Sequence, residues 1–334
     1  MHDLARTLVE WIEIPSVTGD EEDYGDALSR ALAAAGFAVE RQEVEPGRSN
    51  ILARAGAPEV VFCTHLDTVP PFYGSRVDRD FVYGRGSCDA KGQAATMLAA
   101  GRELLASGED RFGFLFTVGE ETTSDGASRA NELLADPWNP RYTIIGEPTS
   151  NAFVSGHKGI FQCSLHGKGV AGHSSQPIGP SAVHELVKTC ARIIESDWGQ
   201  HPVFGPGTVN LGEIAGGVAS NVIADKAQAS FLLRAVEDPP AVEARLRELI
   251  GEHVELVLSE NRYGPIKFHV PEGEDAEVVA FGTDAPHMKR WGTPLLFGAG
   301  AIMDAHTDHE KVGLSELEAC AARHVRTARE LLAT

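Results

Sequence analysis

Imidazole and carboxylate side chains follow the ends of four apolar runs in this 334-residue chain. The runs span residues 59–64, 112–118, 142–145 and 293–297. If they are parallel strands of an open sheet, their carboxyl ends lie along one edge, where such sheets bind ligands. We therefore expect one crevice that gathers the polar residues following the runs: His65, Asp67, Glu120, Glu121, Glu147 and His306.

Two histidines and several carboxylates make a donor set that suits a pair of divalent cations. Two ions that share a carboxylate sit roughly 3.5–4 Å apart and hold a hydroxide between them. Asp89 is a candidate for the shared carboxylate, but it also precedes a predicted helix that begins near Gly92, and aspartate is a preferred N-cap residue. Taken alone, each candidate residue has a structural interpretation as well.

Local spacing predicts different roles for neighbouring side chains. His65 and Asp67 are two residues apart, so on an extended segment they point the same way, and Asp67 would accept the second imidazole N–H. Glu120 and Glu121 are adjacent and would diverge, so that one binds metal while the other acts as general acid and base. The structural alternatives are a turn at a strand end for the first pair and an acidic first helical turn for the second.

The elements that must position these residues follow an α/β pattern. Two amphipathic helices are expected within residues 1–36, and buried, mostly parallel strands then alternate with helices. From about 156 to 263 the pattern changes to alternating strands with two helices, which is typical of a ferredoxin-like α+β unit. We expect a mostly parallel twisted sheet with helices on both faces, formed by 1–155 and 264–334, interrupted by an inserted domain at 156–263.

Composition narrows the class of protein. The net charge of −19 disfavours nucleic acid and anionic membranes as partners, and no apolar run is long enough to cross a bilayer. The start of the chain lacks the pattern of a signal peptide, and the five cysteines are scattered, which favours reduced thiols in the cytoplasm. No surplus of basic residues surrounds the motifs, which disfavours a metallophosphoesterase.

Six ordered segments resemble the two-zinc aminoacylase and carboxypeptidase superfamily, over nearly the whole chain. That superfamily includes acetylornithine deacetylase, succinyl-diaminopimelate desuccinylase and bacterial glutamate carboxypeptidase. The segments are Thr64–Pro70 (THLDTVP), Gly84–Gly92 (GRGSCDAKG), Gly119–Thr122 (GEET), Gly146–Thr149 (GEPT), Gly172–Pro177 (GHSSQP) and Ala305–Asp308 (AHTD).

The resemblance implies a site for two divalent metal ions, with zinc expected first and cobalt or manganese as alternatives. The implied ligand sets are His65, Asp89 and Glu147 for one ion and Asp89, Glu121 and His306 for the other. By the same resemblance, Glu120 would deprotonate the bridging water and later protonate the leaving amine, and Asp67 would orient His65.

Two further side chains remain alternative ligands. His309 lies three residues after His306, but Ala305-His306-Thr307 resembles the deacetylase form of the motif and favours His306. Cys88 stands beside Asp89 and could be a soft ligand, although a small buried thiol is the expected role.

The inserted domain resembles the lid of this superfamily, which commonly also forms a homodimer interface. His173 matches a histidine that reaches the active site of a neighbouring subunit and stabilises the oxyanion. Asn221 and Arg234 match positions that grip a substrate carboxylate, for which arginine has a planar fork. The expected partners are therefore a small-molecule substrate and a second copy of the chain.

The expected reaction removes an N-acyl group, with acetyl expected first, from an amino acid such as N-acetylornithine or N-acetyl-lysine. Segments 145–149 and 305–308 most resemble the deacylases of arginine and lysine biosynthesis. A succinyl-diaminopimelate desuccinylase and a carboxypeptidase or dipeptidase are the alternatives with the same chemistry. A catalytically degenerate binding protein is the alternative from another class, and the carboxylate at Glu120 argues against it.

Overall fold

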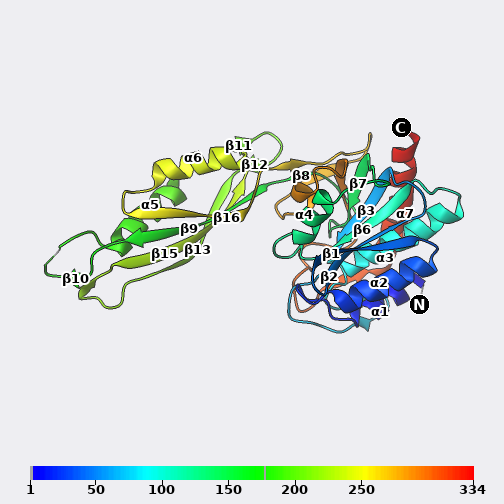
Figure 1. Cartoon of the computed structure of the whole chain (residues 1–334), viewed down its shortest axis with the longest axis horizontal. Helices are drawn as coiled ribbons and strands as arrows, with labels where there is room; N and C mark the ends of the chain where they lie inside the picture. The colour runs from blue at the N-terminus through cyan, green and yellow to red at the C-terminus, as the bar shows by residue number, and fades with distance from the viewer. Residues whose placement is uncertain (1–2, 177) are drawn as a thin grey trace. The chain divides into compact units, whose positions relative to one another are not determined.

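The computed structural model describes residues 3–176 and 178–334, so Met1, His2 and Pro177 of the Gly172–Pro177 segment lie outside the described residues. The chain divides into two compact units (Figure 1). Unit 1 comprises Met1–Ser155, Phe268–Glu277 and Thr283–Thr334, and unit 2 comprises Gly156–Lys267 and Val278–Gly282. No helix within the described ranges is long and apolar enough to span a membrane.

The predicted domain ranges differ from these units at two short segments. Residues 264–267 and 278–282, predicted to lie in the discontinuous domain, group with unit 2. The first segment does so because Ile266 and Lys267 pair as an antiparallel strand with His157 and Gly156. The segment 278–282 groups with unit 2 because the hydroxyl of Tyr263 packs closely against Gly282.

A six-stranded sheet forms the centre of unit 1, with the strand order β1-β2-β6-β3-β7-β19. Neighbours β6, β3, β7 and β19 are parallel, whereas β1 and β2 form an antiparallel hairpin at one edge. Every residue of β3 and β6 is buried, as expected for parallel strands covered on both faces. The strand bounds are β1 (Ala38–Glu45), β2 (Arg48–Arg54), β3 (Val60–His65), β6 (Phe112–Thr117), β7 (Tyr142–Ile145) and β19 (Thr293–Leu296).

Helices cover both faces of this sheet, which confirms the predicted fold class for unit 1 (Figure 1). Four helices share one hydrophobic core with Phe62 and Phe114; they are α1 (Asp3–Ile12), α2 (Glu22–Ala34), α3 (Lys91–Ala106) and α7 (Leu314–Ala333). On the opposite face, Cys63 contacts Met288 just beyond the 3-10 helix η1 (Ala285–His287), and Asn50 donates a hydrogen bond to α4 (Asp125–Glu132). A small sheet completes the unit, formed by β4 (Arg76–Val77), β5 (Phe81–Tyr83) and β20 (Lys311–Gly313).

One polar side chain lies inside the core of unit 1. The His324 ring of α7 is 5.3 Å from the Phe62 ring and 4.6 Å from the Phe297 ring, measured between centroids. Its Nε2 is 3.6 Å from Cys320 Sγ, and its Nδ1 has no hydrogen-bond partner among the described residues. Burial lowers the pKa of His324 to about 3, so the native protein holds a neutral imidazole here.

Unit 2 is a four-stranded antiparallel sheet with two helices packed on one face. In chain order the elements are β9 (Gly159–Lys168), α5 (Ala182–Glu195), β13 (Thr208–Gly216), β15 (Lys226–Ala235), α6 (Pro239–Leu249) and β16 (Val254–Tyr263). This β-α-β-β-α-β order, with the sheet order β13-β15-β9-β16, is the ferredoxin-like arrangement that the sequence predicted. Alternate residues of β9 are buried, and Phe161 and Leu165 pack in one core with Leu186 of α5.

The remaining strands are short. Two of them, β8 (Phe153–His157) and β18 (Ala276–Val279), run across the residue boundaries between the units. The others are β10 (Gly172–His173), β11 (Gln200–His201), β12 (Gly205–Pro206), β14 (Val222–Ile223) and β17 (Ile266–Lys267).

Candidate metal centre

The carboxyl ends of the parallel strands position most of the predicted site. His65 is the last residue of β3, Glu120 and Glu121 follow β6, Glu147 follows β7, and His306 lies in the loop after β19. These four strands are neighbours in the sheet, so their ends meet at one edge, as the sequence pattern predicted. Asp89 reaches the same edge from the turn that leads into α3.

Asp89 lies between two imidazoles. Its Oδ1 is 2.9 Å from His65 Nε2, and its Oδ2 is 3.2 Å from His306 Nε2. The same His306 nitrogen is 3.0 Å from Glu121 Oε1. His65, Asp89 and Glu121 each offer a ligand atom within 4.8 Å of the others, and they form the one such group among the described residues.

The interpretation of Asp89 as a helix cap is wrong. The N-cap residue of α3 is Ala90, and no side chain accepts a capping hydrogen bond there. The acidic-turn interpretation of Glu120 and Glu121 is wrong as well, because the following helix α4 begins only at Asp125. Helix capping and the helix dipole therefore do not account for these carboxylates.

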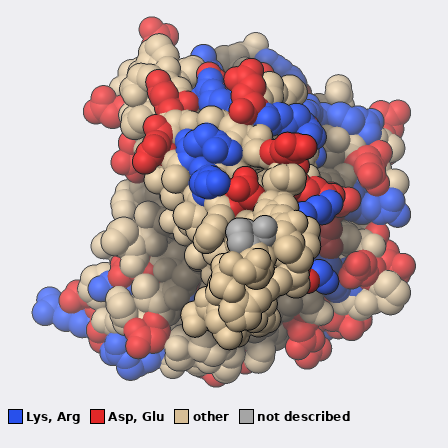
Figure 2. Space-filling view, turned by 90° about the vertical axis from the view of Figure 1, so that its left-hand side faces the viewer, with Lys and Arg blue, Asp and Glu red and all other residues tan. Residues whose placement is uncertain are grey.

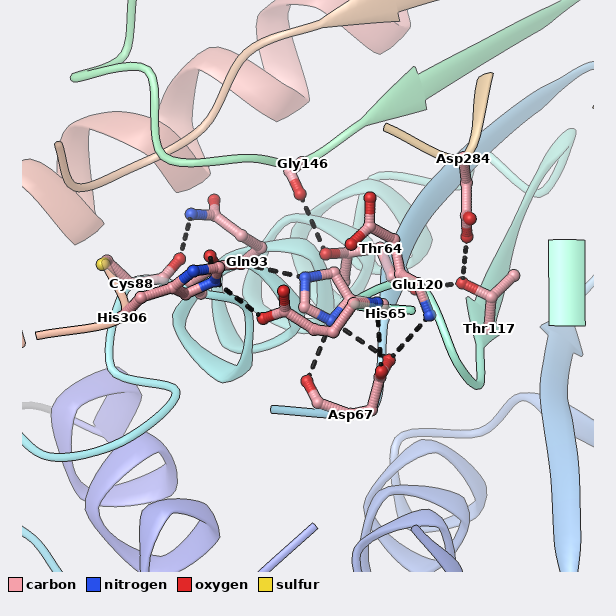
Figure 3. Close-up of polar contacts among 12 residues, drawn as sticks. Thr64, His65, Asp67, Cys88, Gln93, Thr117, Glu120, Gly146, Asp284 and His306 are labelled. Carbon is pink, nitrogen blue, oxygen red and sulfur yellow. Dashed lines mark hydrogen bonds and ion pairs between the residues drawn. The ribbon is translucent and has the colours of Figure 1, made fainter. Parts of the chain in front are cut away.

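Asp67 contacts His65 mainly through its backbone. His65 Nδ1 lies 2.9 Å from the Asp67 carbonyl oxygen and 3.4 Å from Asp67 Oδ1. A carbonyl oxygen only accepts, so Nδ1 carries a proton, and Nε2, which contacts Asp89, is the nitrogen that could bind a metal ion after losing its own proton. The Asp67 carboxylate itself accepts hydrogen bonds from the backbone N–H of Glu120 at 3.1 Å and of Glu121 at 3.2 Å (Figure 3).

This cluster of side chains holds more carboxylate than its imidazoles can neutralise. Hydrogen bonds that His306 donates to the carboxylates of Asp89 and Glu121 raise the pKa of His306 to about 10. Burial, followed by repulsion from Glu147, raises the pKa of Glu120 well above its usual value, and burial likewise raises the pKa of Glu147. Divalent cations would relieve this repulsion, so the residues present fit a metal centre.

Neither alternative ligand joins this group. The His309 side chain is 65% exposed, and its Nδ1 pairs with Asp308 Oδ1 at 2.8 Å. Cys88 is fully buried, with its Sγ 3.6 Å from Glu310 Oε1, and burial raises the pKa of its thiol well above the usual value. The geometry favours His306 over both.

Several buried polar residues that support the site were missed in the sequence. Asp284 Oδ2 accepts a 2.7 Å hydrogen bond from Thr117 Oγ1 at the end of β6 (Figure 3), and burial raises the pKa of Asp284 to about 6. Gln93 Nε2 donates to the carbonyl oxygens of Cys88 at 2.7 Å and Ala299 at 2.6 Å. Neither residue follows an apolar run, so the pattern that found the other side chains did not include them.

The predicted site residues of unit 2 lie at its two ends. His173 is exposed on β10, and the next residue, Ser174, donates its N–H to the Asn221 carbonyl oxygen at 3.0 Å, so His173 and Asn221 share one tip. Arg234 lies on β15 opposite Ile160. It is eight residues, or about 26 Å, along the strand from Lys226, the first residue of β15, which follows shortly after Asn221 and β14. One copy of unit 2 therefore cannot place Asn221 and Arg234 on the same carboxylate.

The tip that carries His173 is uncharged. Residues 169–184 and 214–224 contain no Lys, Arg, Asp or Glu. Ile178 is 68% exposed and Val218 is 84% exposed. This surface forms the tan lobe at the centre of Figure 2.

Comparisons with known proteins agree with the fold and the motifs. Residues 61–330 match the family model described as peptidase family M20/M25/M40. A peptidase M20 domain-containing protein of Schizosaccharomyces pombe is 36% identical over 322 residues, which cover 92% of this chain and 79% of that protein. A protein of Aspergillus terreus named "Probable carboxypeptidase" is 34% identical over 353 residues, covering 92% of this chain and 81% of that one. The crystal structure of a tripeptidase from Staphylococcus aureus matches with a TM-score of 0.84 at 20% identity, covering 99% of this chain and 98% of that one.

Proposed function

This chain belongs to peptidase family M20/M25/M40, and on that premise we propose that it hydrolyses an amide bond in a small amino-acid derivative with the aid of two divalent metal ions. The observation that carries the proposal is the position of Asp89, whose two carboxylate oxygens contact two different imidazoles. A carboxylate whose two oxygens each contact a different imidazole nitrogen is suited to bridge two cations.

The proposed ligand sets are those that the resemblance of the motifs implies: His65, Asp89 and Glu147 for one ion, and Asp89, Glu121 and His306 for the other. By the same resemblance zinc is the expected ion, with cobalt or manganese as substitutes, and nitrogen and oxygen donors suit all three. When bound, such ions supply Lewis acidity to the substrate carbonyl and lower the pKa of a bound water.

Glu120 is the proposed general base and acid. It stands next to Glu121, and its backbone N–H is held by the carboxylate of Asp67. Burial raises its pKa above the usual value of a carboxyl group, which favours the uptake of a proton. Glu120 would take a proton from the attacking water and give it to the nitrogen of the leaving amine.

Unit 2 would supply the residues that hold the substrate. We propose that Arg234 binds a substrate carboxylate, because its Nη1 is buried without a hydrogen-bond partner among the described residues. His173 and Asn221 lie at the opposite end of the same unit, so they would serve a second copy of the chain. The uncharged, apolar tip supports such a homodimer, since exposed apolar surface favours association.

The proposed substrates share the group R–CO–NH–CHR′–COO⁻, which carries the carboxylate that Arg234 would bind. When R–CO is a simple acyl group, the reaction is the deacylation of an amino acid such as N-acetylornithine or N-acetyl-lysine, and the net charge of −19 agrees with a cationic product. When R–CO is an aminoacyl group, the reaction is that of a carboxypeptidase or dipeptidase, and this second candidate is favoured by the name of the Aspergillus terreus relative.

A substrate panel tests the proposal and separates the two candidates. Purified protein loaded with Zn²⁺, Co²⁺ or Mn²⁺ is given N-acetylornithine, N-acetyl-lysine, succinyl-diaminopimelate and a set of dipeptides, and amine release is measured. We expect turnover that depends on the metal for one class of substrate. A protein that binds metal but turns over no compound of either class would support the degenerate binding protein instead.

A further inference from the structure

A buried ion pair lies directly behind the proposed bridging aspartate. Glu310 is the fourth residue after His306, and its Oε2 accepts a 2.6 Å hydrogen bond from Arg85 Nη1. The two side chains are 1% and 2% exposed, respectively. Removing two charges from water is costly, so burial of such a pair is weak evidence for a role in stability alone. Neither residue belongs to the proposed ligand sets.

The second oxygen of Glu310 faces the backbone of the segment that carries Asp89. Glu310 Oε1 accepts hydrogen bonds from the backbone N–H groups of Cys88 and Asp89, each at 3.2 Å. In addition, Gly84 N–H donates to the carbonyl oxygen of Glu310 at 3.0 Å. One residue thus binds three amides of the segment 84–89, and two of the bonds are strengthened by the carboxylate charge.

Arg85 connects the same segment to the loop of His306. Its Nη1 donates to the Thr307 carbonyl oxygen at 3.2 Å, and its Nε donates to the Pro71 carbonyl oxygen at 3.3 Å. Thr307 adjoins His306, whose φ of 63° is uncommon for a residue with a side chain. The backbone of this ligand loop therefore needs support from its surroundings, and Arg85 and Glu310 provide it.

We propose that Glu310, held by Arg85, is a positioning residue that sets the spacing between the segment of Asp89 and the segment of His306. Because the side chain of Asp89 contacts both imidazoles, a shift of its backbone amide would change the distance to each of them. Glu310 acts through Asp89 and contacts no reacting atom. The inference rests on the proposed metal centre.

The test measures metal affinity rather than activity. Metal-free wild type, Glu310→Asp and Glu310→Gln are titrated with Zn²⁺ against a chromophoric chelator. Glu310→Asp keeps the charge but is one methylene too short to hold Arg85 and the two amides together, and Glu310→Gln keeps the length but loses the charge. We expect both variants to bind Zn²⁺ about tenfold to hundredfold more weakly, the usual effect of losing a residue that orients a metal ligand.

The matched control is Glu21→Gln. Glu21 is 1% exposed and binds Arg48 at 3.0 and 3.1 Å, so its loss also disturbs a buried ion pair in unit 1. Among the described residues, no hydrogen bond joins the Glu21 side chain to a segment that carries a proposed ligand. We expect the control to unfold at a lower temperature and to keep wild-type affinity for Zn²⁺. Hydrogen–deuterium exchange of the peptide 85–92 in chelator should quicken in both Glu310 variants and stay unchanged in the control.

The outcomes are distinct. Wild-type affinity in Glu310→Asp, with loss only in Glu310→Gln, would show that the charge alone matters and would overturn the positioning role. An equal loss of affinity in Glu21→Gln would overturn it too, because general destabilisation would then explain the effect. If wild type itself bound no Zn²⁺, the proposed metal centre would fail rather than this inference alone.

Discussion

Acid should destabilise unit 1 through His324, and the size of the effect follows from its burial. The imidazole lies between Phe62 and Phe297, and its pKa is lowered to about 3, against about 6.5 in an unfolded chain. Between these two values the unfolded chain binds a proton that the native protein excludes, so the free energy of unfolding decreases as the pH falls. Above pH 6.5 both states are neutral at this residue, and His324 has no effect on the pH dependence.

The magnitude can be worked out for a convenient interval. From pH 7 to pH 5, protonation of the unfolded chain alone removes about 2 kcal/mol of stability, since each full pH unit below 6.5 contributes about 1.4 kcal/mol. His324→Leu keeps a side chain of similar size but cannot titrate. The variant should therefore lose about 2 kcal/mol less than wild type over the same interval, whatever its stability at pH 7.

The assay is urea unfolding of the metal-free protein in chelator, followed by tryptophan fluorescence. Three of the four tryptophans lie in unit 1, so both proteins carry Trp198→Phe to remove the signal of unit 2. Leu317→Val, also on α7, is the packing control and should lower stability equally at both pH values. Parallel pH dependence of wild type and His324→Leu would refute the reasoning, because it would mean that the native core admits the proton.

Four further predictions concern the proposed centre. Glu120→Gln should lower kcat about 10²- to 10⁴-fold while the metal content and KM persist, and a variant with wild-type kcat would remove Glu120 as the base. Dialysis against a chelator should abolish activity, and Zn²⁺, Co²⁺ or Mn²⁺ should restore it, as measured by metal analysis and rate; activity without metal would contradict the proposed mechanism. Arg234→Ala should lower kcat/KM about 10- to 100-fold for substrates with a free carboxylate, the equivalent of a lost charged hydrogen bond, but leave carboxyl-amidated substrates unaffected. When the inactive His173→Ala and Glu120→Gln variants are mixed, subunit exchange should form heterodimers that regain part of the activity. Sedimentation of the wild type as a monomer alone would argue against the dimer.

The local sequence pattern was sufficient to locate the candidate residues that follow buried strands. Parallel strands covered on both faces must be apolar throughout, so β3, β6 and β7 stand out in the sequence and point to His65, Glu120 and Glu147. The same reasoning could not decide the role of Asp89. An aspartate just before a helix suits either role, and the structure removes only the first interpretation, because Ala90 is the N-cap of α3. The bridging role stays a proposal.

The residues that support the site could not be predicted from the local sequence pattern, for a physical reason. Glu310 and Arg85 are 225 residues apart, and Asp284 and Thr117 are 167 apart. These contacts depend on how the sheet and its loops pack in three dimensions. The local hydrophobic pattern of the sequence carries no information about that packing. The antiparallel edge of β1 and β2 was likewise not anticipated, because an edge strand and a central strand have similar propensities.

The discontinuity of unit 1 has a consequence for synthesis on the ribosome. His65, Asp89, Glu121 and Glu147 leave the exit tunnel early, but His306 follows Glu147 by 159 residues, which is about 8–30 s of translation. During that interval the residues of unit 2 emerge, and β7 has no β19 to pair with. The nascent chain thus carries an open strand edge and four of its five proposed ligands until the last segment is made, so this interval is when a chaperone would be needed and when metal loading cannot yet be completed.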